Sequence, residues 1–160
     1  MRDKLITEMK KYFGKDRTRI EHALKVLSYA ERIAEKVKAD QLTITGAAIL
    51  HDIGIPESER KYNSSSGKYQ EIEGPPIAER IMNKLNISRE RINHICKIIA
   101  NHHSGENIDT PEFRILWDSD WIVNIEEEGL AGKKSKKELH NFIDRIFRTD
   151  TGKKIAKEGF

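Results

Sequence analysis

The chain has 160 residues, of which 37% are apolar and 34% charged, and its formal net charge is +3 at pH 7. This length suits one domain, and a lean apolar content beside a heavily charged surface favours helices over a β-sandwich. No apolar run approaches the roughly 20 residues that cross a bilayer, and the first four residues lack a secretory pattern. A single cysteine excludes an internal disulfide and fits a reducing compartment, so we expect a cytoplasmic protein.

Apolar spacing predicts consecutive helices along the chain and no strand. The first helix runs from about Thr18 to Lys38, and His22 lies beside its apolar stripe. The second opens near Thr43 or Thr45 and ends at Gly54, a residue typical of the position just past a helix. The doublet His51-Asp52 would then occupy its last turn.

Residues 56–73 are polar and rich in turn formers, so we expect a loop there. Later helices are predicted at five places: from Pro75-Pro76 through Leu85, from Ser88 to about His102, from Thr110 to Gly129, from Ser135 through Phe147, and briefly after Thr151. The prediction is a single domain over residues 1–160 with six to seven helices. Its motif-bearing core covers about 18–128, and its C-terminal helices cover about 135–160.

The doublet His51-Asp52 is the most informative feature, because it ends an apolar stretch where burial of polar groups is costly. A neutral imidazole nitrogen and a carboxylate oxygen are good ligands for a divalent cation. Upstream, His22 lies on an amphipathic helix, and downstream Asp120 lies in an aromatic, apolar segment. Together these four residues indicate a metal site.

At these positions the chain resembles the HD superfamily of metal-dependent phosphohydrolases, whose pattern is a histidine, a His-Asp doublet and a lone aspartate. The resemblance implies an all-α domain of the HD type, with a divalent metal held by His22, His51, Asp52 and Asp120. It also implies hydrolysis of a phosphate ester of a small metabolite, with a nucleotide as the expected substrate. Asp52 and His51 are the expected catalytic residues, and Asp52 either orients or deprotonates the attacking water.

Mixed imidazole and carboxylate ligation suits manganese, iron, cobalt, nickel or zinc better than calcium. Magnesium is compatible where substrate phosphate supplies further oxygens. Availability and ligand softness favour manganese or iron. Such an ion lowers the pKa of its water towards neutrality and polarises a phosphoryl oxygen, so no protein nucleophile is needed.

Two aspartates compete for the last ligand position. Asp120 fits the family pattern better than Asp118, for which we expect a hydrogen bond or salt bridge between helices. His102 and His103 lie at the end of a predicted helix, and we expect one of them to line the active site; in some HD subfamilies, extra histidines hold a second metal. Here Gln70 stands where such a subfamily would place a histidine, which argues against a dinuclear site.

Basic residues of the predicted loop are candidates for meeting phosphate, namely Arg60, Lys61 and Lys68, and Arg19 is a candidate one turn before His22. Glu71, next to Gln70, is a further candidate pocket residue. No aromatic-basic interleaving typical of single-strand binders is present, so no specific nucleic-acid binding is expected. A homo-oligomer stays open, because Phe113, Trp117 and Trp121 fit either a core or a dimer face.

Four other functions are alternatives to this phosphohydrolase activity. A non-catalytic module would keep the metal as a structural staple and bind a nucleotide for a partner. An alarmone hydrolase is disfavoured, because Ile53-Gly54-Ile55-Pro56 follows the doublet where that group has a Glu-Asp pair, and a cyclic-dinucleotide hydrolase is disfavoured because no Gly-Tyr-Pro stretch occurs. A di-iron oxygenase needs more ligands than the sequence offers.

Overall fold

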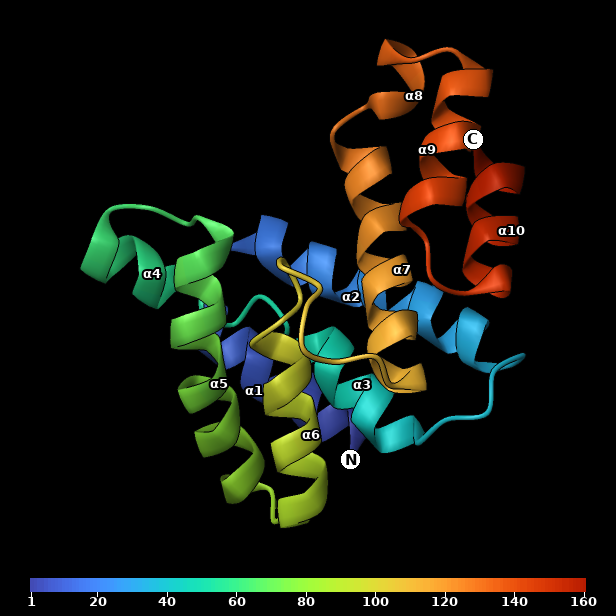
Figure 1. Ribbon diagram of the computed structural model, residues 1–160. Coiled ribbons are helices and arrows are strands. Elements are labelled where there is room, and N and C mark those ends of the chain that lie inside the picture. The colour runs from blue at the N-terminus through green and yellow to red at the C-terminus, as the bar shows by residue number, and fades with distance from the viewer.

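Ten α-helices and no strand make up the computed structural model, which describes residues 1–160 (Figure 1). The prediction of an all-α fold is confirmed, whereas the predicted count of six to seven helices is too low. The three helices that the sequence pattern missed are α1, α4 and α8, the last of which is a single turn. The bounds are α1 Arg2–Phe13, α2 Arg17–Ala34, α3 Gln41–Leu50, α4 Ile55–Tyr62, α5 Gly67–Lys84, α6 Arg89–Ile99, α7 Pro111–Glu127, α8 Leu130–Lys133, α9 Lys136–Ile146 and α10 Asp150–Gly159.

The loop predicted over residues 56–73 is wrong, because α4 and the first two turns of α5 occupy most of it. Only Ile55 and Ser58 of α4 are buried, so this eight-residue helix carries no apolar period. Pro75 and Pro76 lie inside α5 rather than at its start. Each proline removes a ladder hydrogen bond, and α5 continues past them because buried residues on both sides of the pair fix its position.

Side-chain caps set where six helices begin. In each, the cap side chain accepts a hydrogen bond from a backbone N–H of the first turn: Asp16, Asp40, Ser88, Thr110, Ser135 and Thr149. The caps at Ser88, Thr110 and Ser135 agree with the sequence prediction.

The helix that precedes the doublet differs from its prediction at both ends. Its cap is Asp40 rather than Thr43 or Thr45, and α3 ends at Leu50. His51 is the C-cap residue, Asp52 lies in the turn that follows, and Gly54 caps α4 rather than ending α3. The doublet therefore lies at the junction of two helices rather than within a last turn.

The centre of the fold is formed by α2, α3 and α7. Helix α2 packs against both of the others, and α3 also packs against α6. One core of buried apolar residues extends from Leu5 in α1 to Ala156 in α10; it includes Phe113, and Trp117 and Trp121 pack against it. Figure 1 shows α4 and α5 to one side of this centre and α8 to α10 to the other. None of the ten helices combines the length and the apolar content needed to span a membrane.

The turn after the doublet packs directly on α5 through two glycines, and Gly54→Ala is expected to destabilise the protein. A Cβ at residue 54 would lie 2.6 Å from the amide nitrogen and 2.8 Å from the Cα of Gly74, both of them backbone atoms. Overpacking of this kind costs about 1–3 kcal/mol. Gly132→Ala in α8 is the matched control, because nothing lies within 4 Å of the corresponding position. Thermal unfolding should give a lower midpoint for Gly54→Ala alone, and equal midpoints would contradict the expectation.

Candidate metal centre

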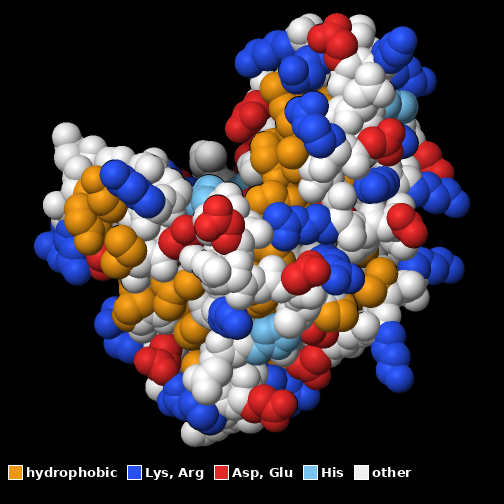
Figure 2. All heavy atoms as spheres, in the orientation of Figure 1, with side chains coloured by type: hydrophobic (Ala, Val, Ile, Leu, Met, Phe, Trp, Pro, Cys, Tyr) orange, Lys and Arg blue, Asp and Glu red, His pale blue; other side chains and the backbone are white.

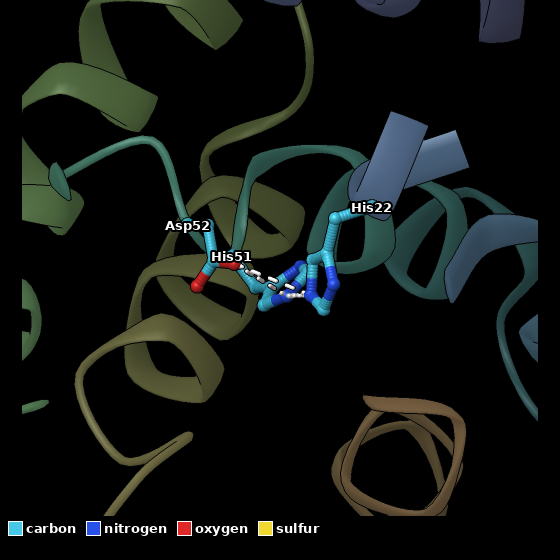
Figure 3. Close-up of side chains that lie close together, drawn as sticks. All are labelled: His22, His51 and Asp52. Atoms are coloured by element: carbon cyan, nitrogen blue, oxygen red, sulfur yellow. Dashed lines mark hydrogen bonds and ion pairs between the residues drawn. The ribbon is translucent and has the colours of Figure 1, made fainter. Parts of the chain in front are cut away.

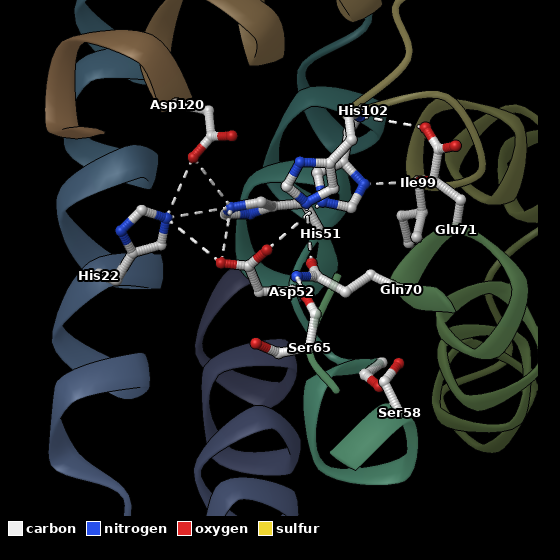
Figure 4. A network of polar contacts seen from close by, with 12 residues as sticks. His22, His51, Asp52, Ser58, Ser65, Gln70, Glu71, Ile99, His102 and Asp120 are labelled. Carbon is white, nitrogen blue, oxygen red and sulfur yellow. Dashed lines mark hydrogen bonds and ion pairs between the residues drawn. The ribbon is translucent and has the colours of Figure 1, made fainter. Parts of the chain in front are cut away.

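Four side chains from three parts of the chain lie close together: His22 from α2, His51 and Asp52 from the end of α3, and Asp120 from α7. Figure 3 shows the first three, and Figure 4 shows them with Asp120. The Nε2 atom of His22 lies 3.0 Å from Asp120 Oδ1, 3.2 Å from His51 Nε2 and 3.3 Å from Asp52 Oδ2. His51 Nε2 lies 3.3 Å from the same two carboxylate oxygens. One nitrogen or oxygen of each residue thus faces a common centre.

Local structure explains how neighbouring residues reach the same point. Within a helix, adjacent side chains diverge by about 100°, but His51 ends α3 and Asp52 belongs to the turn that follows. His22 lies on the buried face of α2 with Val26, and Asp120 lies on the buried part of α7. The cluster therefore forms where α2 and α7 pass the end of α3.

The Nδ1 atoms of three buried histidines face oxygen atoms that can only accept a hydrogen bond. His51 Nδ1 lies 2.8 Å from the carbonyl of Ala48, and His102 Nδ1 lies 2.6 Å from the carbonyl of Ile99. His22 Nδ1 lies 3.0 and 3.1 Å from the two carboxylate oxygens of Glu127. Each Nδ1 therefore donates, which leaves the Nε2 of the neutral ring with a free lone pair, as a metal-binding imidazole requires.

The charges of the cluster favour a cation at its centre. Burial of His51 disfavours its charged form, yet the carboxylates of Asp52 and Asp120 raise its pKa well above the ordinary value. Burial also disfavours the ionised form of Asp120, but the positive charge of His51 and a hydrogen bond from His22 lower the pKa of this carboxyl. The carboxylates thus stay ionised, and their charge is balanced by protons on the imidazoles or by a metal that replaces those protons.

The four residues fit a divalent metal ion. Two ligand atoms bound about 2.1 Å from one ion at tetrahedral or octahedral angles lie roughly 3.0–3.4 Å apart. The two imidazole Nε2 atoms lie 3.2 Å apart, and each lies 3.0–3.3 Å from one oxygen of Asp52 and one oxygen of Asp120. Two imidazole nitrogens and two carboxylates form a donor set that several divalent metals accept. His22, His51 and Asp52 also form a group whose ligand atoms lie within 4.8 Å of one another.

His102 borders the cluster on the side of Asp52. Its fully buried Nε2 lies 3.4 Å from Asp52 Oδ1 and has no hydrogen-bond partner. His103 lies next to it, and together with Asp52 the two histidines form a second group of ligand atoms within 4.8 Å. However, Nε2 of His103 donates to Gln70 Oε1 at 2.9 Å, and the amide of Gln70 donates to the carbonyl of Ser65 at 2.6 Å. Gln70 therefore engages His103 and leaves His102 as the histidine that faces the cluster.

Glu71 and Lys68 lie outside the cluster. One oxygen of Glu71 accepts from the backbone N–H groups of His103 and Ser104 and from the Ser104 hydroxyl, at 2.9–3.1 Å. This carboxylate holds the turn after α6 against α5. The ammonium of Lys68 lies 4.9 Å from the ring centre of Tyr69, in a cation–π contact.

The other cations that sequence analysis named are paired with carboxylates. Arg19 contacts Asp16 and Glu59, each at 2.6 Å. Lys61 lies 2.9 Å from Glu73, and Arg60 pairs with Glu57. None of these cations reaches the cluster in the structure. Figure 2 shows histidine side chains in the surface hollow that has α4 and α5 on one side and α7 to α10 on the other.

Asp118 does not join the cluster, and the structure corrects its inclusion among the pocket residues. Its carboxylate is fully buried and accepts from the backbone N–H groups of Arg148 and Thr149 at 2.8 Å and from the Thr149 hydroxyl at 2.6 Å. Burial raises the pKa of Asp118 to about 6. The guanidinium of Arg148 lies over the Trp117 ring and donates to the carbonyl of Gly105. Asp118 therefore joins α7 to the segment between α9 and α10.

Sequence analysis missed one residue of the site, Glu127, whose contact with His22 joins positions 105 residues apart. Its signal in the sequence is its spacing, because it follows Asp120 by seven residues, two turns of helix, and so lies on the same face of α7.

Comparison with known proteins agrees with this fold. The profile of the HD domain matches residues 19–140. The crystal structure of a predicted HD superfamily hydrolase from an uncultured Thermotogales bacterium is similar to this chain, with a TM-score of 0.71 and 20% sequence identity over 96% of this chain and 82% of that chain. Among proteins with curated functions, none matches this sequence. Since the profile covers more than half of the residues, including all four of the cluster, the chain belongs to the HD-domain family.

Proposed function

We propose that this protein is a metal-dependent phosphohydrolase that hydrolyses a phosphate ester of a small metabolite, with nucleotides as the favoured substrate class. The observation that carries the proposal is the cluster of His22, His51, Asp52 and Asp120, in which each histidine Nε2 lies 3.0–3.3 Å from the other Nε2 and from one oxygen of each aspartate. Membership of the HD family, a superfamily of metal-dependent phosphohydrolases, supports the same reaction class. The preference for nucleotides rests on the family resemblance alone.

In this proposal His22, His51, Asp52 and Asp120 hold one divalent ion. Manganese or iron is favoured, and magnesium, cobalt, nickel and zinc are compatible with the donor set. When bound, such an ion lowers the pKa of water and polarises a phosphoryl oxygen.

Asp52 is the proposed catalytic residue, because its two oxygens face different groups. Oδ2 faces the cluster and Oδ1 faces His102. The first oxygen binds the ion, and the second is free to orient the attacking water or accept its proton. His51, whose Nε2 lies 3.3 Å from Oδ2, would bind the same ion. His102 is the proposed neighbour of this water, because its buried Nε2 lies 3.4 Å from Oδ1 and has no hydrogen-bond partner.

One observation favours the alternative, a non-catalytic module that binds a nucleotide and keeps the metal as a structural staple. The flanking cations Arg19, Arg60 and Lys61 are each paired with carboxylates, so none is free to bind phosphate. Lys68 is the one candidate cation without a carboxylate partner, so a phosphohydrolase would bind phosphate through Lys68 or would have to open one of these ion pairs.

Phosphate release from mononucleotides, dinucleotides and sugar phosphates, measured with metal-stripped protein before and after addition of manganese, separates the two functions. Turnover that requires the metal supports the phosphohydrolase and begins to define its substrate. Absence of turnover by folded, metal-loaded protein contradicts the proposal, and nucleotide binding under those conditions would identify the module.

Addition of the metal that the site binds is expected to raise the thermal unfolding midpoint of the metal-stripped protein. A ligand that binds only the folded state at 100 times its dissociation constant stabilises it by about 2.7 kcal/mol, or roughly 5–10 °C for a chain of this size. Differential scanning fluorimetry of metal-stripped protein with each of the six metals measures the shift. Asp120→Ala, which lacks one proposed ligand, should show a smaller shift. The same midpoint with and without every metal would contradict the proposed site.

A further inference from the structure

Glu127 accepts a hydrogen bond from the outer edge of the His22 ring. Its two oxygens lie 3.0 and 3.1 Å from Nδ1, while Asp120 contacts Nε2 at 3.0 Å on the opposite edge. Both carboxylates belong to α7, two turns apart, so one helix holds the imidazole of α2 between them. No lysine or arginine forms an ion pair with Glu127, and His22 is the only side chain with which it interacts.

The other two histidines near the centre are held differently. His51 and His102 donate from Nδ1 to the carbonyls three residues earlier, those of Ala48 and Ile99. These carbonyls belong to the last turns of α3 and α6, and the two histidines follow the ends of those helices. His22 lies inside α2, where the carbonyls of the preceding turn serve the helix ladder. Its ring therefore depends on a side chain for orientation, and that side chain carries a full negative charge.

We propose that Glu127 is a positioning residue of the metal centre, which orients His22, keeps the proton on Nδ1 and so presents the Nε2 lone pair to the ion. This inference rests on the proposed metal site. A carboxylate partner of this kind also adds a third negative charge beside a divalent cation, which strengthens its binding.

Three variants of the full chain test the inference. Glu127→Ala removes the acceptor and the charge, whereas Glu127→Gln keeps an acceptor oxygen and removes only the charge. Glu128→Gln is the matched control, since the adjacent glutamate carries the same charge at the end of α7 and contacts no histidine. Glu127 is partly exposed, so its variants are expected to fold.

The first readout is manganese affinity, measured by isothermal titration calorimetry. Loss of a partner that orients a metal-binding histidine typically weakens binding by about 10–100-fold, so this decrease is expected for Glu127→Ala, with a smaller one for Glu127→Gln and none for Glu128→Gln. The second readout is the ¹⁵N NMR spectrum of the His22 ring in zinc-loaded protein. Wild type and Glu127→Gln should show a protonated Nδ1 whose proton exchanges slowly with water. In Glu127→Ala this proton should exchange faster.

Wild-type affinity in Glu127→Ala, or an equal decrease in Glu128→Gln, would overturn the inference. Wild type that binds no divalent metal would overturn it together with the proposed function. Metal binding that depends on Glu127 without any phosphate release would contradict the function alone, whereas metal-dependent turnover with unchanged affinity in Glu127→Ala would contradict this inference alone.

Discussion

Asp52→Ala is expected to lower kcat/KM for phosphate release by more than about 100-fold, the upper range for loss of a residue that merely supports a ligand. The substitution removes one carboxylate oxygen 3.3 Å from both His22 Nε2 and His51 Nε2 and another 3.4 Å from His102 Nε2. The variant thus loses a metal ligand, a negative charge beside His51 and the oxygen proposed to accept a proton from water.

Metal content and steady-state kinetics on the best substrate of the panel measure this effect together. Asp109→Ala is the matched control, because its carboxylate pairs with Arg114 at the surface and lies outside the cluster. Unchanged activity is expected for the control. A folded Asp52→Ala variant that releases phosphate at the wild-type rate would contradict both the catalytic role and the metal site.

Asp118→Ala is expected to destabilise the protein by about 3 kcal/mol, equivalent to an unfolding midpoint roughly 6–12 °C lower. The change leaves the N–H groups of Arg148 and Thr149 and the Thr149 hydroxyl without their acceptor. Thr149 is buried, so water does not readily replace the lost partner. Chemical denaturation followed by circular dichroism gives the free energy of unfolding.

Asp118→Asn distinguishes the effect of the lost hydrogen bonds from the effect of the lost side-chain volume. The asparagine fills the same space, and its amide oxygen still accepts from one or two of the three donors. An intermediate loss is expected. Equal stability of Asp118→Ala and wild type would show that the connection between α9 and α10 does not depend on this carboxylate.

The sequence was sufficient to predict an all-helical HD-type fold because the relevant signals are local. The stripe that contains His22, the apolar segment before His51 and the caps Ser88, Thr110 and Ser135 all lie within a few residues of the elements that they define. Helix α1 carries a similar local signal, since Leu5, Met9 and Phe13 recur every fourth residue and all are buried. The sequence prediction nevertheless lacked this helix. Helix α4 had no such signal, since tertiary contacts rather than periodicity stabilise it.

Side-chain partners in the site depend on how distant helices cross, which one sequence does not reveal. The pairing of Glu127 with His22 requires α2 and α7 to pack at one particular position. The positions of Asp118 and Asp120, two residues apart, likewise follow from the rotation of α7, which turns one carboxylate towards His22 and the other towards Thr149. Sequence analysis favoured this arrangement only through the family pattern.

Arg148 gives the C-terminal helices a mechanical connection to the centre of the fold. Its backbone N–H bonds to Asp118, its guanidinium lies 4.3 Å from the Trp117 ring centre, and the same group donates to Gly105, three residues beyond His102. A local opening of α10 therefore loosens the turn that holds His102 as well as the end of the chain. The amide hydrogen-exchange rates of that turn and of α10 should consequently change together, because the two segments open as one cooperative unit.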